Sequence, residues 1–124
     1  MVDFKNGAIV KLKKDASCRE SGVQKLLIPG EKVLGSYTAI RDYVVFTDKR
    51  VISVNVQGIS GKKKDFTSMP YSKISVFSGE TAGTLDLDSE LEMYFSGVGK
   101  VKFEFHGNCD IEAIGQSISS YVLK

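Results

Sequence analysis

Few residues of this sequence have the type and spacing that chemistry requires. His106 is the only histidine, and acid–base or nucleophilic catalysis there would need a partner Ser or Cys together with an orienting carboxylate. The local sequence does not supply that set of groups. A histidine on the surface or in a turn is therefore the favoured interpretation, and we expect the protein not to be an enzyme.

Four acidic residues alternate with apolar ones in one stretch and could suggest a cation site: Asp86, Asp88, Glu90 and Glu92. Residues two apart on a strand lie about 6.5–7 Å from each other, so they line one face and do not converge on one ion. This pattern predicts the solvated outer face of a hairpin. We accordingly expect no metal and no cofactor.

Three consecutive lysines could attract anionic membrane headgroups or phosphate, at about 1 kcal/mol for each lysine: Lys62, Lys63 and Lys64. Asp65 follows them directly, and no aromatic or apolar side chain interleaves with the run. A charge run of this kind is usually a solvated edge. Headgroup or anion binding at these three residues therefore remains the alternative functional hypothesis.

Length and charge restrict the class of protein. The chain has 124 residues, which is the size of one domain, and we treat residues 1–124 as a single unit. Its net charge of +2 is too small for a dedicated nucleic-acid binder, so no nucleic-acid partner is expected. The sequence shows no secretory leader, and Cys18 and Cys109 lie far apart. Reduced thiols in a cytoplasmic protein are the resulting expectation.

The spacing of apolar residues divides the chain into three parts. A capping box at Ser17–Glu20 begins a helical pattern, which predicts a short helix in an N-terminal extension over residues 1–30. Residues 31–106 alternate with a period of two and predict seven antiparallel strands, which close into a barrel or fold into two orthogonal layers. Residues 108–123 carry one apolar stripe and predict a helix that caps the barrel, with Asn108 as its N-cap.

The last two strands should pair so that their apolar residues share one face and opposite charges meet. This rule places Leu91 across from Phe103 and Glu92 across from Lys102. A pairing of Glu92 with Glu104 would contradict it.

The hairpin of residues 43–56 is apolar on both faces. Its two-residue turn predicts the cross-strand pairs that fill one face: Tyr43 with Val54, and Val45 with Ile52. The other face carries Val44, Phe46 and Val51. A barrel strand normally shows a polar face to solvent, so this second apolar face should be covered, either by the N-terminal helix or by a neighbouring copy. These three residues are therefore the candidate interface.

Five segments together resemble the bacterial pleckstrin-homology (PH) domain family: Gly30–Val33, Arg41–Ile52, Gln57–Lys63, Pro70–Ile74 and Phe77–Leu91. The resemblance implies a seven-stranded barrel with a C-terminal capping helix, an intracellular bacterial setting and a tendency to self-associate into rings. It implies no reaction. The phosphoinositide site of the eukaryotic relatives does not carry over, because that site needs several basic residues in the first inter-strand loop. Here the connection from Ile40 to Tyr43 is tight and holds one Arg beside an Asp.

The expected fold class is therefore mainly β and PH-like, a seven-stranded antiparallel barrel or orthogonal sandwich with a short N-terminal helix and a C-terminal capping helix. The leading functional hypothesis is a non-enzymatic scaffold that assembles with copies of itself, head-to-tail into a ring, and binds another protein. The alternative is a peripheral adaptor that binds anionic membrane headgroups through its basic loop.

Overall fold

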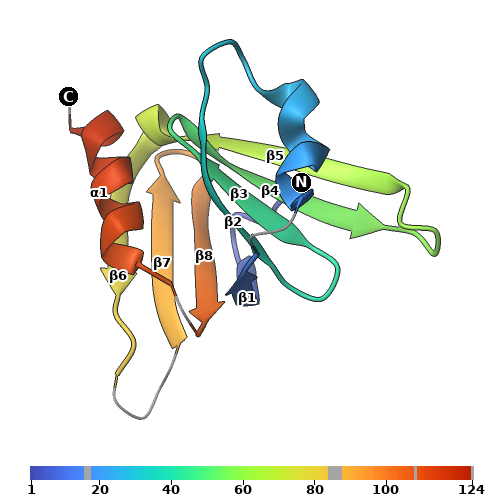
Figure 1. Ribbon diagram of the computed structural model, residues 1–124. Helices are drawn as coiled ribbons and strands as arrows, with labels where there is room; N and C mark the ends of the chain where they lie inside the picture. The colour runs from blue at the N-terminus through green and yellow to red at the C-terminus, as the bar shows by residue number, and fades with distance from the viewer. Residues whose placement is uncertain (16–17, 84–87, 108, 124) are drawn as a thin grey trace.

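The computed structural model describes residues 1–15, 18–83, 88–107 and 109–123, which form one curled sheet and a C-terminal helix (Figure 1). The strands are β1 (Ala8–Lys14), β2 (Val33–Thr38), β3 (Tyr43–Thr47), β4 (Arg50–Gln57), β5 (Lys63–Pro70), β6 (Ile74–Glu80), β7 (Asp88–Phe95) and β8 (Gly99–His106). The helices are the 3-10 helices η1 (Cys18–Leu26) and η2 (Tyr71–Lys73) and the α-helix α1 (Ile111–Val122). A mainly β fold with one C-terminal α-helix was the prediction, and it is confirmed.

The strands follow one another in the order β5-β4-β3-β2-β1-β8-β7-β6, so β5 and β6 are the two outermost strands of the sheet. β1 pairs antiparallel with β2 and parallel with β8. It thereby joins the meander β2–β5 to the meander β6–β8. The sheet curls into a half-barrel, and α1 packs against η2, β6 and β7 at one side of it (Figure 1).

The N-terminal part of the chain differs from the prediction. Residues 8–14, expected to belong to a helical extension, form β1, so the described residues contain eight strands and not seven. The alternation that would reveal β1 is interrupted at Lys11, whose φ is 57°, and the register with β8 shifts between Ile9 and Leu12. The short helix predicted for this extension is not seen as predicted, because residues Cys18–Leu26 form the 3-10 helix η1.

Both predicted helix caps include residues outside the described part of the chain, Ser17 and Asn108. The cap of α1 is instead Asp110, whose carboxylate accepts a hydrogen bond from the Ala113 N–H at 3.0 Å. An acceptor at this position satisfies one of the free N–H groups of the first turn.

The predicted hairpin registers are confirmed. Leu91 lies across from Phe103 and Glu92 across from Lys102. In the first hairpin, Tyr43 pairs with Val54 and Val45 with Ile52, as the two-residue turn requires.

The two apolar faces of the β3–β4 hairpin contribute to two different cores. Val44, Phe46 and Val51 are at most 2% exposed and lie in the main core, with residues of β7, β8 and α1. The opposite face forms a smaller core beneath η1, made of Val23, Tyr43, Val45, Ile52 and Val54. The structure thus corrects the candidate interface: the chain itself covers Val44, Phe46 and Val51, because they face the inside of the half-barrel. The 3-10 helix η1 covers the other face through Val23.

Gly99 fixes the N-terminal segment against β8. Its φ is 139°, and a Cβ built there would lie 2.1 Å from the carbonyl oxygen of Phe4, which accepts a hydrogen bond from the Lys100 N–H. We expect Gly99→Ala to lower the free energy of unfolding by more than about 1 kcal/mol, because alanine is strained at this φ and displaces Phe4. Urea unfolding measures the loss. Gly115→Ala, in open space within α1, is the control and should be neutral or stabilising.

Candidate functional site

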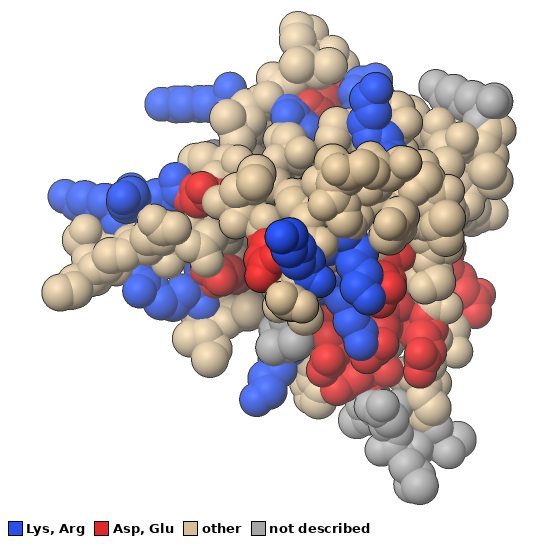
Figure 2. Space-filling model, turned by 180° about the vertical axis from the view of Figure 1, so that it is seen from behind, with Lys and Arg blue, Asp and Glu red and all other residues tan. Residues whose placement is uncertain are grey.

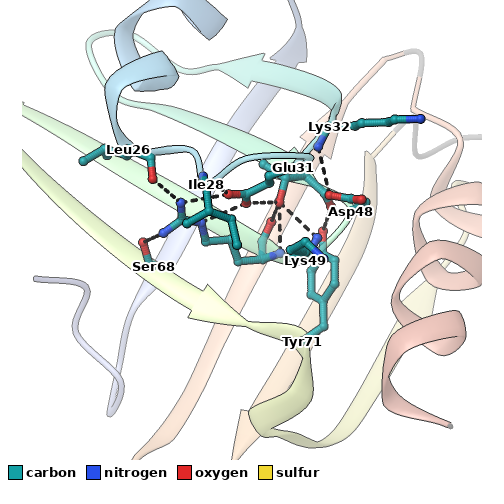
Figure 3. A network of polar contacts seen from close by, with 10 residues as sticks. Leu26, Ile28, Glu31, Lys32, Asp48, Lys49, Ser68 and Tyr71 are labelled. Carbon is teal, nitrogen blue, oxygen red and sulfur yellow. Dashed lines mark hydrogen bonds and ion pairs between the residues drawn. The ribbon is translucent and has the colours of Figure 1, made fainter.

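A largely buried ion pair joins the connection between η1 and β2 to the start of β4 (Figure 3). The Arg50 Nε and one terminal nitrogen donate to the two carboxylate oxygens of Glu31, at 2.9 and 3.0 Å. The Glu31 side chain is 1% exposed and the Arg50 side chain 20% exposed. The guanidinium also donates to the Leu26 carbonyl and to the Ser68 hydroxyl, so its donors tie η1 and β5 to the same point.

Glu31 is satisfied by groups of its own chain. Burial opposes its ionisation, but hydrogen bonds from Arg50, the Thr47 hydroxyl and the Ile28 N–H outweigh that effect and lower its pKa. Thr47 in turn accepts hydrogen bonds from the N–H groups of Lys49 and Arg50. The motif Phe46-Thr-Asp-Lys-Arg50 therefore has a structural role, because it holds η1 and β5 against the start of β4. Its polar groups are directed at one another, and we do not assign a ligand to it.

His106 lies on the outer face of β8, exposed as predicted, with Nδ1 2.7 Å from an oxygen of Asp88. Ser89 follows Asp88 on β7 and is buried on the opposite face, because successive residues of a strand point to opposite sides. Cys109 is partly buried, and burial raises the pKa of its thiol, which disfavours the reactive thiolate. The sheet therefore lies between the His106 imidazole on its outer face and both the Ser89 hydroxyl and the Cys109 thiol on its inner face.

Three of the four acidic residues singled out in the sequence are described, and Asp86 lies outside the described residues. Glu90 and Glu92 form ion pairs with diagonal lysines of β8, Lys102 at 3.2 Å and Lys100 at 3.9 Å. In the part of the chain that the structure describes, no group of three or more His, Cys, Asp or Glu side chains is arranged to hold a metal ion.

The three candidate lysines stand at the turn of the β4–β5 hairpin. Lys62 precedes β5, Lys63 and Lys64 begin it, and all three side chains are exposed. Lys63 and Lys64 point to opposite faces of the strand, so they do not converge on one phosphate. They form a positively charged end of the hairpin.

Two fully exposed isoleucines lie at the same end of the sheet, and the sequence analysis did not single them out. Ile40 is in the β2–β3 loop and is 94% exposed; Ile59 is in the β4–β5 loop and is 108% exposed relative to a reference side chain. The Arg41 guanidinium of the first loop donates to the Gly58 carbonyl of the second, so the loops are neighbours. The sequence signal for Ile59 was its place in a turn, Gly58-Ile-Ser-Gly61, where an apolar side chain has nothing to pack against.

A cavity of about 460 Å³ lies beside the first of these loops, with Lys11, Ile40, Arg41 and Asp42 among its lining residues. Charge is unevenly distributed over the surface of the molecule. Figure 2 shows basic side chains at the end of the molecule where the β4–β5 turn lies, and acidic side chains gathered over β7 and β8. The face over β7 and β8 also carries Lys100 and Lys102, which pair with Glu92 and Glu90, whereas three exposed lysines stand at the β4–β5 turn.

Comparison with known proteins gives a consistent result. A family model described as the bacterial PH domain matches residues 3–122. The chain is 57% identical over 72 residues to the uncharacterized protein YjqA of Bacillus subtilis, and that match covers 58% of each chain. It is 27% identical over 100 residues to YozO of the same organism, covering 81% of this chain and 86% of YozO.

Solved structures are also similar to this chain, and two of them are described here. One is a DUF1696 family protein with a pleckstrin-homology domain from Shewanella loihica, with a TM-score of 0.73, 32% identity, and coverage of 90% of this chain and 97% of that one. The other is a pleckstrin-homology domain from Shewanella amazonensis, with a TM-score of 0.61, 36% identity, and coverage of 84% and 85%. Among the described residues, no helix has the length and apolar character needed to cross a membrane.

Proposed function

This chain belongs to the bacterial PH domain family, and from that premise we propose that it is a non-enzymatic binding module that associates with copies of itself through the exposed edge of β6. A PH-like fold is a scaffold that does not by itself determine function. The observation that carries the proposal is the open sheet: β5 and β6 are its outermost strands, and neither has a second strand beside it among the described residues.

The helix α1 packs against β6, but the strand itself has few of the features that normally protect a sheet edge. Natural edge strands are shielded by charged residues, proline or bulges in mid-strand, because unpaired N–H and C=O groups otherwise recruit another strand. From Ile74 to Gly79 this strand has no charge and no proline, and its one bulge falls at its start, between Ile74 and Val76. Val76 is 63% exposed and lies across from Tyr94, which is 49% exposed. The edge is thus accompanied by a small apolar patch.

The other edge strand, β5, offers a neighbouring copy only a short uncharged segment with which to pair. β5 begins with Lys63 and Lys64 and ends with Pro70, but the segment Phe66–Met69 between them is uncharged. Because the two edges lie at opposite ends of one sheet, β6 of one copy can pair with this segment of the next. Such a head-to-tail contact repeats and closes into a ring when the rotation between copies allows.

We expect Val76→Lys to convert the assembly into monomers. A lysine on an edge strand places charge where a second strand must lie, and at this exposed position it should change the stability of the isolated fold by no more than about 0.5 kcal/mol. Size-exclusion chromatography with light scattering measures the mass, and far-UV circular dichroism checks that the variant is folded.

Val76→Thr is the matched control, since threonine keeps the branched shape and strand propensity without the charge. It should assemble like the natural protein. A natural protein that is strictly monomeric at tens of micromolar would refute self-association, and a Val76→Lys variant of unchanged mass would refute the β6 edge as its site.

A further inference from the structure

A groove of about 590 Å³ runs along the free edge of β5. Its lining includes four consecutive residues of that strand, Thr67–Pro70. Successive residues of a strand point to opposite faces, so a groove that touches all four lies against an edge of the strand and not against one face. β4 pairs with one edge of β5. The groove therefore lies at the other edge, where no strand pairs among the described residues.

The groove has an apolar floor. Met69, Ile74 and Phe95 line it and are at most 5% exposed, since they belong to the main core. The Phe4 ring also lines it and contacts the ring of Phe95 edge-to-face, with 5.9 Å between the ring centres. Val98, in the turn between β7 and β8, is 60% exposed at the rim. A bulky apolar side chain that enters the groove would thus be removed from water.

The edge of β5 also offers main-chain hydrogen bonds. In an antiparallel pair every second residue directs its N–H and its C=O away from the partner strand, which here means toward the groove. The N-terminal segment lies elsewhere on β5. The Val2 N–H donates to the Thr67 hydroxyl at 3.1 Å, and Thr67 points to the same face as the buried Met69. The segment therefore covers the inner face of the strand and does not run along its edge.

The charged side chains around this edge are positive or already paired. Lys73 is the only charged side chain among the described residues that line the groove, and it is exposed. Lys63 and Lys64 begin β5. Asp65, the acidic residue of the strand, pairs with the amino group of Met1 at 2.8 Å. Positive charge thus stands at both ends of the edge, which are about 20 Å apart along the strand.

We propose that the β5 edge binds an extended acidic peptide of a partner protein. The peptide adds a strand to the sheet and places one bulky apolar side chain in the groove. Its acidic side chains lie toward Lys73 at one end and toward Lys63 and Lys64 at the other. In this mode of recognition main-chain hydrogen bonds supply affinity, and pockets for alternate side chains supply specificity. The positive ends favour an acidic peptide over a basic one.

This binding goes beyond self-association and is tested apart from it. The same segment of β5 is proposed above to pair with β6 of another copy, so a peptide and a copy compete for it. Binding is therefore measured on the Val76→Lys variant, in which β6 is blocked and β5 is unchanged. The result then does not depend on whether the natural protein assembles.

A phage-displayed library of random peptides supplies the probe, with peptides of about twelve residues so that they can span the edge. Enriched sequences should share one bulky apolar residue, flanked by residues that favour strands and by Asp or Glu. Replacing the apolar residue of an enriched peptide with alanine should weaken binding about tenfold or more, as measured by fluorescence anisotropy. Added salt should also weaken it. If no sequence is enriched, or if the enriched sequences are rich in Lys and Arg, the proposal is wrong.

Two substitutions test the surface. Val98→Asp places a charge at the rim of the groove, and Lys73→Glu reverses the charge beside it. Each should weaken binding of an enriched peptide about tenfold or more and leave the melting temperature unchanged, because both positions are exposed. Ile40→Asp and Lys25→Glu are the matched controls at exposed positions that do not line the groove. Equal losses in the controls would contradict the assignment to this surface.

Hydrogen exchange shows whether the bound peptide pairs with the strand. An enriched peptide should slow the exchange of amides in Phe66–Met69 that point away from β4, and Val98→Asp should abolish that protection. A peptide that binds without protecting any amide of this segment would overturn the proposal, because its main chain would then not extend the sheet.

Discussion

Arg50→Ala lowers the free energy of unfolding by about 3–5 kcal/mol, the largest single effect we expect from a polar substitution in this protein. The Glu31 carboxylate is 1% exposed and keeps its charge in the fold because Arg50 pairs with it. Without the guanidinium, a buried charge is left with neutral donors only. The same substitution also removes the hydrogen bonds to Leu26 and Ser68 that fix η1 and β5. Chemical unfolding at neutral pH measures the loss.

The loss should depend on pH in a defined direction. In the natural protein the pKa of Glu31 is lowered below its ordinary value of 4.5. Its ionised form therefore contributes stability that is fully present above about pH 4.5 and is lost as the pH falls through the folded-state value. In Arg50→Ala the ion pair is gone while burial still opposes the ionised carboxylate, so protonation should relieve that variant at low pH. The difference in stability between the two proteins should shrink on acidification, and a constant difference would contradict this account.

Lys49→Ala is the control for Arg50→Ala, since it removes a cation from the same turn at an exposed position. It should change the free energy of unfolding by no more than about 0.5 kcal/mol. Arg50→Lys should fall between the two, because lysine keeps the charge but lacks the two-pronged geometry that matches a carboxylate.

Phe46→Ala is expected to cost about 3–5 kcal/mol of folding free energy. The ring is 2% exposed and lies among the aromatic side chains of the main core, 6.0 Å from the ring centre of Phe103 and 5.8 Å from that of Tyr37. Removing it opens a cavity that a close-packed interior fills only in part. Thermal or urea unfolding measures the loss.

The substitution also distinguishes the two views of the β3–β4 hairpin. If Phe46 lay at an interface between copies, Phe46→Ala would yield a stable monomer; as a core residue, it yields a destabilised chain. Val76→Ala is the comparison at an exposed apolar position, and it should leave the stability of the fold within about 0.5 kcal/mol. A Phe46→Ala variant as stable as the natural protein would mean that the ring does not belong to the main core.

The elements predicted best from the sequence are those in which turn geometry and charge act together. In the β3–β4 hairpin the two-residue turn at Asp48-Lys49 allows one register in which apolar residues share a face, and that register is observed. In the β7–β8 hairpin the opposite charges of Glu92 and Lys102 select the register, which is also observed. Local pattern suffices there because each strand pairs with its neighbour in sequence.

Two features could not be predicted, for different physical reasons. β1 has a bulge at Lys11 and two partners distant in sequence, so neither a period of two nor a hairpin turn marks it. The β3–β4 hairpin is apolar on both faces, and alternation alone cannot say which face meets the main core. Which face does so depends on the distant strand that supplies Phe103 and Phe105 and on the position of η1.

The two exposed isoleucines, Ile40 and Ile59, were not singled out from the sequence because turns are expected to be polar. Both residues lie within residues 31–106, where alternation predicts strands, and alternation does not tell which apolar side chains stay exposed in the loops between strands. That their two loops are neighbours is visible only from the hydrogen bond that the Arg41 guanidinium donates to the Gly58 carbonyl.

The parallel pairing of β1 with β8 has a consequence for how the chain folds. Ala8 lies beside Lys102 and Leu12 beside Phe105, so the two ends of the sequence must meet before the sheet is continuous. The other pairings, apart from that of β1 with β2, are hairpins or short connections that close small loops. The entropy of loop closure grows with chain separation, and folding slows as contacts become less local. The two meanders should therefore form first, and their joining through β1 should be the slow step. Substitutions at Leu12 would then change the folding rate more than equally buried substitutions within the β4–β5 hairpin.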